Sequence, residues 1–323
     1  MLDEYGRTID YLRISVTDRC NLRCVYCMPE TGVPDIPHDG LLRYEEIVRI
    51  VRLMQPLGIK KVRITGGEPL ARRGCLGLVQ QLHDLGGLTR IAMTTNGVLL
   101  KGQAAKAKEA GLTDVNISLD TLDEVRYHQI TRLGDVSTVL SAMDEALSCG
   151  LKVKINAVPV RGLNEDDLTE VAALAKDRPV CVRFIELMPV GCGASLSPIP
   201  TDEVLQKMEA AFGKLMPDES RHGDGPARYG KPEGFVGSIG VISAVSHEFC
   251  ANCNRVRLTS DGQLKLCLNH QTGLNLRELL RSGASDAEMT EAIQAAIQKK
   301  PQRHGFFESV PDREARRMNQ IGG

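Results

Sequence analysis

Apolar stretches and amphipathic stretches alternate along residues 11–187. The apolar stretches resemble β-strands and the amphipathic ones have the apolar spacing of helices. The strands are expected at residues 11–16, 61–65, 90–95, 114–119, 152–160 and 180–187, and the helices at 44–55, 76–85, 103–110, 137–149 and 165–175, the last one capped by Asn164. Such alternation is typical of right-handed β-α-β units in a parallel sheet. The sequence predicts an α/β fold, an incomplete (βα)6 barrel of the TIM type, two units short of a complete one.

The composition changes after residue 215. Residues 215–240 contain six glycines, which indicates a segment that crosses into a second region. Strands are expected there at residues 239–242 and 255–259, and helices at 275–281 and 286–298. We therefore predict two domains, a partial barrel over residues 1–215 and a C-terminal α+β region over residues 216–323. The tail, residues 313–323, is basic and ends in glycines, a composition that by default indicates disorder.

Three cysteines with C-x3-C-x2-C spacing follow the first predicted strand. Cys20, Cys24 and Cys27 would lie on a loop at the strand's carboxyl end, where sites in such folds gather. A cubane iron–sulfur cluster takes four thiolates, so this loop would leave one iron open. A zinc ion with three protein ligands and one open position is the competing interpretation, and a chance cluster of cysteines is the other.

A second triplet, Cys250, Cys253 and Cys267, lies in the C-terminal region. A structural zinc site needs four ligands, and no further cysteine is close in sequence. His247 or His270 could complete it, so zinc stays open for this triplet alone.

Positive charges lie on strands that should be apolar. A parallel sheet covered on both faces is normally built from apolar residues, so charged residues there must face an interior space or a partner. Two more arginines alternate on the strand after the second cysteine pair and share one face. Together these residues predict an interior that receives a polyanion. They are Arg13, Lys61, Arg63, Lys154 and Arg183, with Arg255 and Arg257 on the later strand.

The overall composition excludes several classes of protein. The formal net charge of the 323 residues is −1 and tryptophan is absent, which disfavours binding to nucleic acid. No run reaches the ~18 apolar residues of a membrane span, and the N-terminus lacks the pattern of a signal peptide. We expect a cytoplasmic protein, in which ten cysteines indicate metal or redox chemistry rather than disulfides.

These motifs resemble those of the radical S-adenosylmethionine (SAM) enzymes. The first triplet followed by Gly66-Gly67-Glu68-Pro69 carries that likeness. Further stretches are similar to the GTP 3′,8-cyclase family of molybdenum-cofactor biosynthesis. These are residues 13–24, 64–70, 183–186 and 253–255, Lys300-Pro301 with His304 and Phe306, and the terminal Gly322-Gly323.

The resemblance implies two [4Fe–4S] clusters, with SAM as the second cofactor and GTP as substrate. Cys20, Cys24 and Cys27 would hold one cluster and Cys250, Cys253 and Cys267 the other. SAM would contact Tyr26, Gly67, Ser118 and Met188. GTP would contact Arg13, Lys61, Arg63, Thr94, Lys154, Arg183, Arg255 and Arg257. Arg13, Arg255, Arg257, Gly322 and Gly323 are the expected catalytic residues.

The implied reaction converts GTP to (8S)-3′,8-cyclo-7,8-dihydroguanosine 5′-triphosphate. A 5′-deoxyadenosyl radical would take the ribose 3′ hydrogen, and the sugar radical would add to C8 of guanine. The implied partners are an electron donor and a cyclic pyranopterin monophosphate synthase downstream, and the chain would be a monomer or a homodimer. The alternatives are a peptide-modifying radical SAM enzyme with an auxiliary cluster and a zinc-binding protein without enzymatic activity.

Overall fold

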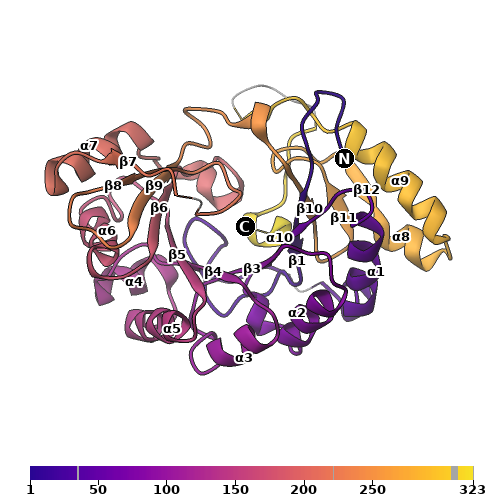
Figure 1. The fold of residues 1–323 in the computed structure, drawn as a ribbon, viewed down its shortest axis with the longest axis horizontal. Helices are drawn as coiled ribbons and strands as arrows, with labels where there is room; N and C mark the ends of the chain where they lie inside the picture. The colour runs from indigo at the N-terminus through magenta and orange to yellow at the C-terminus, as the bar shows by residue number, and fades with distance from the viewer. Residues whose placement is uncertain (35, 221, 307–311, 323) are drawn as a thin grey trace.

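One continuous sheet organises the molecule. The computed structural model describes residues 1–34, 36–220, 222–306 and 312–322. The described residues form a 12-stranded sheet in the order β12-β11-β10-β1-β2-β3-β4-β5-β6-β9-β8-β7, curved around a central space with helices outside it (Figure 1). The first strands and helices are β1 (Tyr11–Ser15), α1 (Tyr44–Met54), β2 (Lys61–Thr65), α2 (Cys75–Asp84), β3 (Arg90–Thr95), α3 (Ala104–Glu109), β4 (Asp114–Ser118), α4 (Glu124–Thr131), α5 (Val136–Ser148), β5 (Lys152–Ala157), α6 (Leu168–Asp177) and β6 (Cys181–Ile185).

The predicted strands β1 to β6 are confirmed, and each pairs in parallel with the next. The outer helices hold the sheet through apolar faces. In α1, Ile47, Ile50, Val51 and Met54 are fully buried, at the spacing that places side chains on one helical face. This packing confirms the α/β class expected from the alternation.

The C-terminal residues extend this sheet at both edges. β9 (Ser238–Ile242) pairs in parallel with β6, and β10 (Arg255–Leu258) pairs in parallel with β1. The division into residues 1–215 and 216–323 therefore stays a prediction, since both parts contribute to one sheet. The remaining elements are α7 (Thr201–Phe212), β7 (Met216–Pro217), β8 (Arg228–Lys231), β11 (Gln263–Lys265), β12 (Gly273–Asn275), α8 (Leu276–Arg281), α9 (Asp286–Gln298) and α10 (Met318–Ile321).

Three local expectations were wrong or incomplete. Asn164 does not cap α6, which begins at Leu168; its side chain accepts from the Val160 N–H and donates to the Asp120 carbonyl. Helices α4 and α7 were missed. The tail, expected to be disordered from its basic composition, contains α10 with Asn319 and Ile321 buried. Tertiary contacts therefore order this segment. In the described part of the chain no helix is long and apolar enough to cross a membrane.

Candidate active site

A cavity of about 590 Å³ lies within the curve of the sheet. Among the described residues that line it, nine are lysine or arginine and four are aspartate or glutamate. Most of the residues predicted from the sequence line it, namely the six cysteines of both triplets, Tyr26, Gly67, Ser118, Met188, Arg13, Arg63, Thr94, Lys154, Arg183, Arg255 and Arg257. Lys61 and Gly322 are not among the lining residues, and Gly323 falls outside the described residues.

The first cysteine loop follows β1 directly. The backbone N–H groups of Cys27 and Met28 both donate to the Cys24 carbonyl, at 2.9 and 3.1 Å, and this turn brings the three thiols to the cavity. Burial raises the pKa of Cys20 to about 11 and that of Cys27 to about 12. A cation at these sulfurs would reverse that shift, because metals bind the thiolate. The donor set therefore fits an iron–sulfur cluster with one iron left open.

Gly67 packs directly against the cysteine loop. Its N–H donates to the Thr17 carbonyl at 2.8 Å, and a Cβ at this position would lie 2.4 Å from the Arg19 carbonyl oxygen. The lack of a side chain at Gly67 is therefore required by this backbone contact.

Glu68 connects this turn to the end of β3. Its buried carboxylate accepts from the Thr95 hydroxyl at 2.9 Å and from the Asn96 N–H at 2.8 Å. Burial raises the Glu68 pKa to about 7, and these donors oppose the shift. Asn96 in turn donates to the Cys20 sulfur at 3.7 Å. The Gly-Gly-Glu-Pro turn thus fixes the cysteine loop relative to two strand ends.

A buried tyrosine–carboxylate pair lies beside the first triplet. The Tyr26 hydroxyl donates to Asp120 Oδ2 at 2.5 Å, and Asp120 Oδ1 accepts from the Val158 N–H at 2.8 Å. Burial raises the Asp120 pKa to about 6. Asp120 follows β4, two residues after Ser118. The pair holds Tyr26 on the cavity wall, next to the strand end that carries Ser118.

Three arginines form a row across neighbouring strands. The register pairs Arg13 on β1 with Arg257 on β10 and with Arg63 on β2. Side chains at paired positions of parallel strands project from the same face. Burial lowers the pKa of Arg13 well below its usual value, and the nearby Arg257 charge adds to the effect. This concentration of like charge in a cavity favours a bound anion.

The partners of these arginines are largely neutral oxygens. Arg63 Nε donates to the Tyr11 hydroxyl at 2.5 Å, Arg183 Nη2 donates to Asn156 Oδ1 at 2.5 Å, and Arg257 Nη1 donates to the Gly322 carbonyl. Lys154 differs, because it pairs with Asp114 at 2.8 Å. Burial nevertheless lowers the Lys154 pKa to about 8. These arginines and Lys154, called the basic wall below, thus carry positive charge that a polyphosphate could neutralise.

Lys61 is held away from the cavity surface by carboxylates. Its ammonium lies 2.7 Å from Asp10 Oδ2 and 3.0 Å from Asp224 Oδ1. Asp224 also pairs with Arg90 at 2.9 Å. Asp224 comes from the glycine-rich segment before β8, for which the sequence gave no role. The Asp224 carboxylate, which lines the cavity, therefore bridges Lys61 and Arg90.

Two cysteines of the second triplet precede β10 in the sequence, and the third follows β11. Cys250 lies in a short 3-10 helix, η4 (Cys250–Asn252), Cys253 comes just before β10, and Cys267 follows β11. Burial opposes ionisation of Cys253, but the charges of Arg255 and Lys300 lower its pKa to about 7. Three thiols beside the positive charges of Arg255 and Lys300 fit a second iron–sulfur cluster.

The histidines considered for this triplet lie elsewhere. His270 pairs with Asp312 at 3.5 Å and the exposed His247 with Asp202 at 3.1 Å, and neither lines the cavity. His304, which the sequence placed only in a motif, is the histidine found near Cys250.

The C-terminal segment closes one side of the site. Asn319 Nδ2 donates to the Asp18 carbonyl at 2.9 Å, which attaches α10 to the first cysteine loop. Gly322 has a φ of 77°, and a Cβ there would lie 3.1 Å from the Ser15 Cβ. The C-terminal end lies inside the curve of the sheet (Figure 1).

Comparison with known proteins identifies the family. Residues 14–175 match the Radical SAM superfamily and residues 180–306 match the family Molybdenum Cofactor Synthesis C. The GTP 3′,8-cyclase of Pelotomaculum thermopropionicum is 47% identical over 327 residues, with 100% of both chains covered. This chain belongs to the GTP 3′,8-cyclase family. The GTP 3′,8-cyclases of Clostridium perfringens and Moorella thermoacetica are 44% and 43% identical to it, again with 100% of each chain covered.

Solved structures of more distant proteins share the fold. Streptococcus suis SuiB bound to S-adenosylmethionine aligns with a TM-score of 0.61 at 16% identity, covering 89% of this chain and 68% of that one. Native anSMEcpe with bound AdoMet aligns with a TM-score of 0.54 at 16% identity, covering 89% and 84%. The family membership and the fold agree with the resemblance inferred from the cysteine motifs.

Several cavity residues were missed from the sequence. Asp120, Asn96, Tyr11 and Arg90 have roles that depend on the hydrogen bonds described above. Asn96 and Asp120 follow the carboxyl ends of β3 and β4, where sites in such folds gather, whereas Tyr11 and Arg90 begin β1 and β3 and offered no such signal. Asp224 had no such signal, because its contact with Lys61 is made across the fold.

Proposed function

We propose that this chain is a radical SAM GTP 3′,8-cyclase, a lyase that forms (8S)-3′,8-cyclo-7,8-dihydroguanosine 5′-triphosphate in molybdenum-cofactor biosynthesis. The observation that carries the proposal is that two cysteine triplets and a row of three arginines on adjacent strands line one cavity. Family membership supports the same reaction. A peptide-modifying enzyme would have no need for a polyanion site of this kind.

Each group of residues has a role in this proposal. Cys20, Cys24 and Cys27 hold the cluster that binds SAM, and Cys250, Cys253 and Cys267 hold the second cluster, facing the guanine. Tyr26, Gly67, Ser118 and Met188 contact SAM. The Asp120 carboxylate, which accepts from the Tyr26 hydroxyl, keeps that ring against the cofactor.

The basic wall binds and orients GTP. Arg13, Arg63 and Arg257 face the triphosphate as a row, and Lys154, Arg183, Arg255 and Thr94 complete its surroundings. Bidentate guanidinium contacts fix both position and direction of the phosphates. This orients the ribose toward the first triplet.

When bound, the reduced first cluster and SAM supply the 5′-deoxyadenosyl radical that removes the ribose 3′ hydrogen. The residues of this chain position the substrate and exclude water. Asn319 anchors the tail over the first cysteine loop, and Val190, Phe306 and Ile321 form a small apolar cluster beside it. A dry site prevents side reactions of carbon radicals. Gly322 and Gly323 take part in catalysis in this proposal, with Arg257 holding the Gly322 carbonyl.

Lys61 joins the triphosphate site only if Asp224 releases it. The two carboxylates that now contact Lys61 would compete with a phosphate. We propose a cytoplasmic enzyme, a monomer or homodimer, that receives electrons from a separate donor. Its product would pass to a cyclic pyranopterin monophosphate synthase, and neither nucleic acid nor a membrane would take part.

The test is an anaerobic reaction of cluster-reconstituted protein with reductant, SAM and GTP carrying deuterium at the ribose 3′ position. Deuterium in 5′-deoxyadenosine, together with a nucleotide isomeric to GTP, is the expected mass-spectrometric result. SAM cleavage without deuterium transfer, with GTP recovered intact, would refute the GTP assignment and leave only the cluster assignment.

A further inference from the structure

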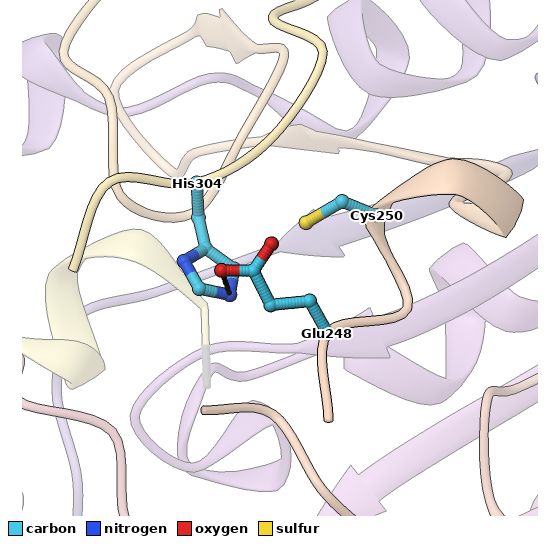
Figure 2. Close-up of side chains that lie close together, drawn as sticks. All are labelled: Glu248, Cys250 and His304. Atoms are coloured by element: carbon cyan, nitrogen blue, oxygen red, sulfur yellow. Dashed lines mark ion pairs between the residues drawn. The ribbon is translucent and has the colours of Figure 1, made fainter. Parts of the chain in front are cut away.

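Three different metal-binding side chains converge at the edge of the second triplet. One ligand atom each of Glu248, Cys250 and His304 lies within 4.8 Å of the other two. Figure 2 shows the Glu248 carboxylate between the His304 ring and the Cys250 thiol. His304 Nε2 is 3.6 Å from Glu248 Oε1. The His304 segment follows α9, so residues some fifty positions apart form this cluster.

The ligand types suit one divalent transition-metal ion. Zinc binds sulfur at about 2.3 Å, histidine nitrogen at about 2.0–2.1 Å and carboxylate oxygen at about 2.0–2.2 Å. Tetrahedral ligands at those lengths are roughly 3.5 Å apart, so the three side chains need to approach by only about 1 Å. Glu248 is exposed and can rotate, while His304 is buried. Three protein ligands leave a fourth position for water.

The histidine is held in place by contacts other than the cluster itself. The Arg7 guanidinium donates to the Cys250 carbonyl at 3.0 Å and to the Pro301 and Gln302 carbonyls at 2.8 Å each. One buried side chain therefore fixes the 3-10 helix of Cys250 against the segment that carries His304. The His304 ring also packs on Phe306, with centroids 4.3 Å apart. Such supporting contacts orient metal ligands and strengthen binding.

We propose that Glu248, Cys250 and His304 form a mononuclear site for Zn²⁺ or Fe²⁺. This site shares only Cys250 with the second cluster, and the ion and the cluster cannot be bound at the same time. The Cys250 thiol releases its proton to solvent and its thiolate binds the ion, without any change of oxidation state. Both sites use the Cys250 sulfur, and exclusion requires that this thiolate does not bridge them; that part rests on the proposed function. An ion here therefore blocks assembly of the second cluster until it leaves.

Cobalt(II) is a suitable probe, since its thiolate charge-transfer absorption reports sulfur ligation. The experiment uses cluster-free, chelator-treated protein carrying Cys20→Ser, Cys24→Ser and Cys27→Ser, kept anaerobic. We expect one Co²⁺ to bind with a thiolate band and to be displaced by Zn²⁺. His304→Ala and Glu248→Gln should each weaken binding at least tenfold, judged from the effect of losing even an outer contact.

Matched variants distinguish Co²⁺ bound by Glu248, Cys250 and His304 from Co²⁺ bound by the three cysteines of the second triplet. His247→Ala removes an exposed histidine of the same region and should change nothing. Cys253→Ser with Cys267→Ser should keep the band, whereas Cys250→Ser should abolish it. Binding that survives His304→Ala and Glu248→Gln, or that is lost with Cys253→Ser and Cys267→Ser, overturns the proposal. Circular dichroism of every variant checks folding.

A final measurement tests the exclusion. Reconstitution of the second cluster should abolish Co²⁺ binding, with iron and sulfide counted on the same sample. Simultaneous occupancy of both would refute exclusion. Failure of the proposed function would leave the Co²⁺ titration of the cluster-free protein unaffected, so the two proposals fail separately.

Discussion

Replacement of Arg257 by methionine should stabilise the protein while weakening GTP binding. Burial lowers the Arg257 pKa from the ordinary value of an arginine to about 10, and the charge of Arg255 adds to the effect. Each pKa unit corresponds to about 1.4 kcal/mol. With some allowance for solvent in the cavity, the charge therefore costs the folded state about 2–3 kcal/mol. Because the folded pKa is the lower one, this cost is complete at neutral pH and disappears only as pH rises through about 10 toward the ordinary pKa of arginine.

Methionine removes that cost and keeps an apolar stem of similar length. The lost bond to the Gly322 carbonyl subtracts about 1 kcal/mol, so the free energy of unfolding should rise by about 1–2 kcal/mol. For a protein of this size the Tm should increase by roughly 1.5–3 °C in calorimetry. A lost charge-assisted contact with phosphate should cost about 2–4 kcal/mol, or about a 30- to 700-fold higher Kd for GTP in anaerobic titration calorimetry.

The prediction combines a higher Tm with a weaker affinity for GTP. A misfolded variant would instead lose both thermal stability and GTP binding. Arg257→Lys keeps the charge but loses the bidentate contact, so it should not raise the Tm and should weaken GTP binding less than Arg257→Met does. Arg178→Met removes an exposed arginine paired with Asp144 and serves as the surface control. A lower Tm with unchanged GTP affinity would show that Arg257 is structural, and the reasoning about the arginine row would be refuted.

Three further predictions concern other parts of the site. Asp224→Asn frees Lys61 from one of its two carboxylates and should lower the KM for GTP by about 3- to 10-fold, since a favourable internal contact no longer competes. Cys24→Ser should abolish SAM cleavage and halve the iron and sulfide content, with the signal of the second cluster retained in electron paramagnetic resonance. Tyr26→Phe leaves the buried Asp120 carboxylate without its hydroxyl donor and should cost about 1–3 kcal/mol of stability, measured by denaturant unfolding.

The first two of these changes have a matched control. Asp202→Asn alters an exposed carboxylate and Cys149→Ser a thiol outside the cavity, so both should behave like the parent protein. An unchanged KM in Asp224→Asn would mean that Lys61 takes no part in phosphate binding. Full iron content in Cys24→Ser would exclude Cys24 as a ligand, and unaltered stability of Tyr26→Phe would show that water replaces the hydroxyl at Asp120.

Local patterns were enough to predict strands β1 to β6, β9 and β10 and the cation-lined interior. Strand β2 illustrates why: a five-residue run that carries Arg63 between Val62 and Ile64 cannot sit in a wholly apolar sheet. The same reasoning failed for Lys61 as a cavity residue. Its strand position was right, but Asp10 and Asp224 hold its ammonium, and a contact between residues 61 and 224 leaves no trace in either local sequence.

The position of β10 is the step that local reasoning could not supply, and it decides whether there is a site at all. Parallel pairing of β10 with β1 aligns Tyr11 with Arg255 and Arg13 with Arg257. A slip of one residue would turn both arginines to the opposite face, because side chains alternate along a strand. The same pairing brings Cys253, just before β10, to the cavity that holds the first triplet at the far end of β1. The β1–β10 register therefore sets the arginine row and the placement of the two cysteine triplets together.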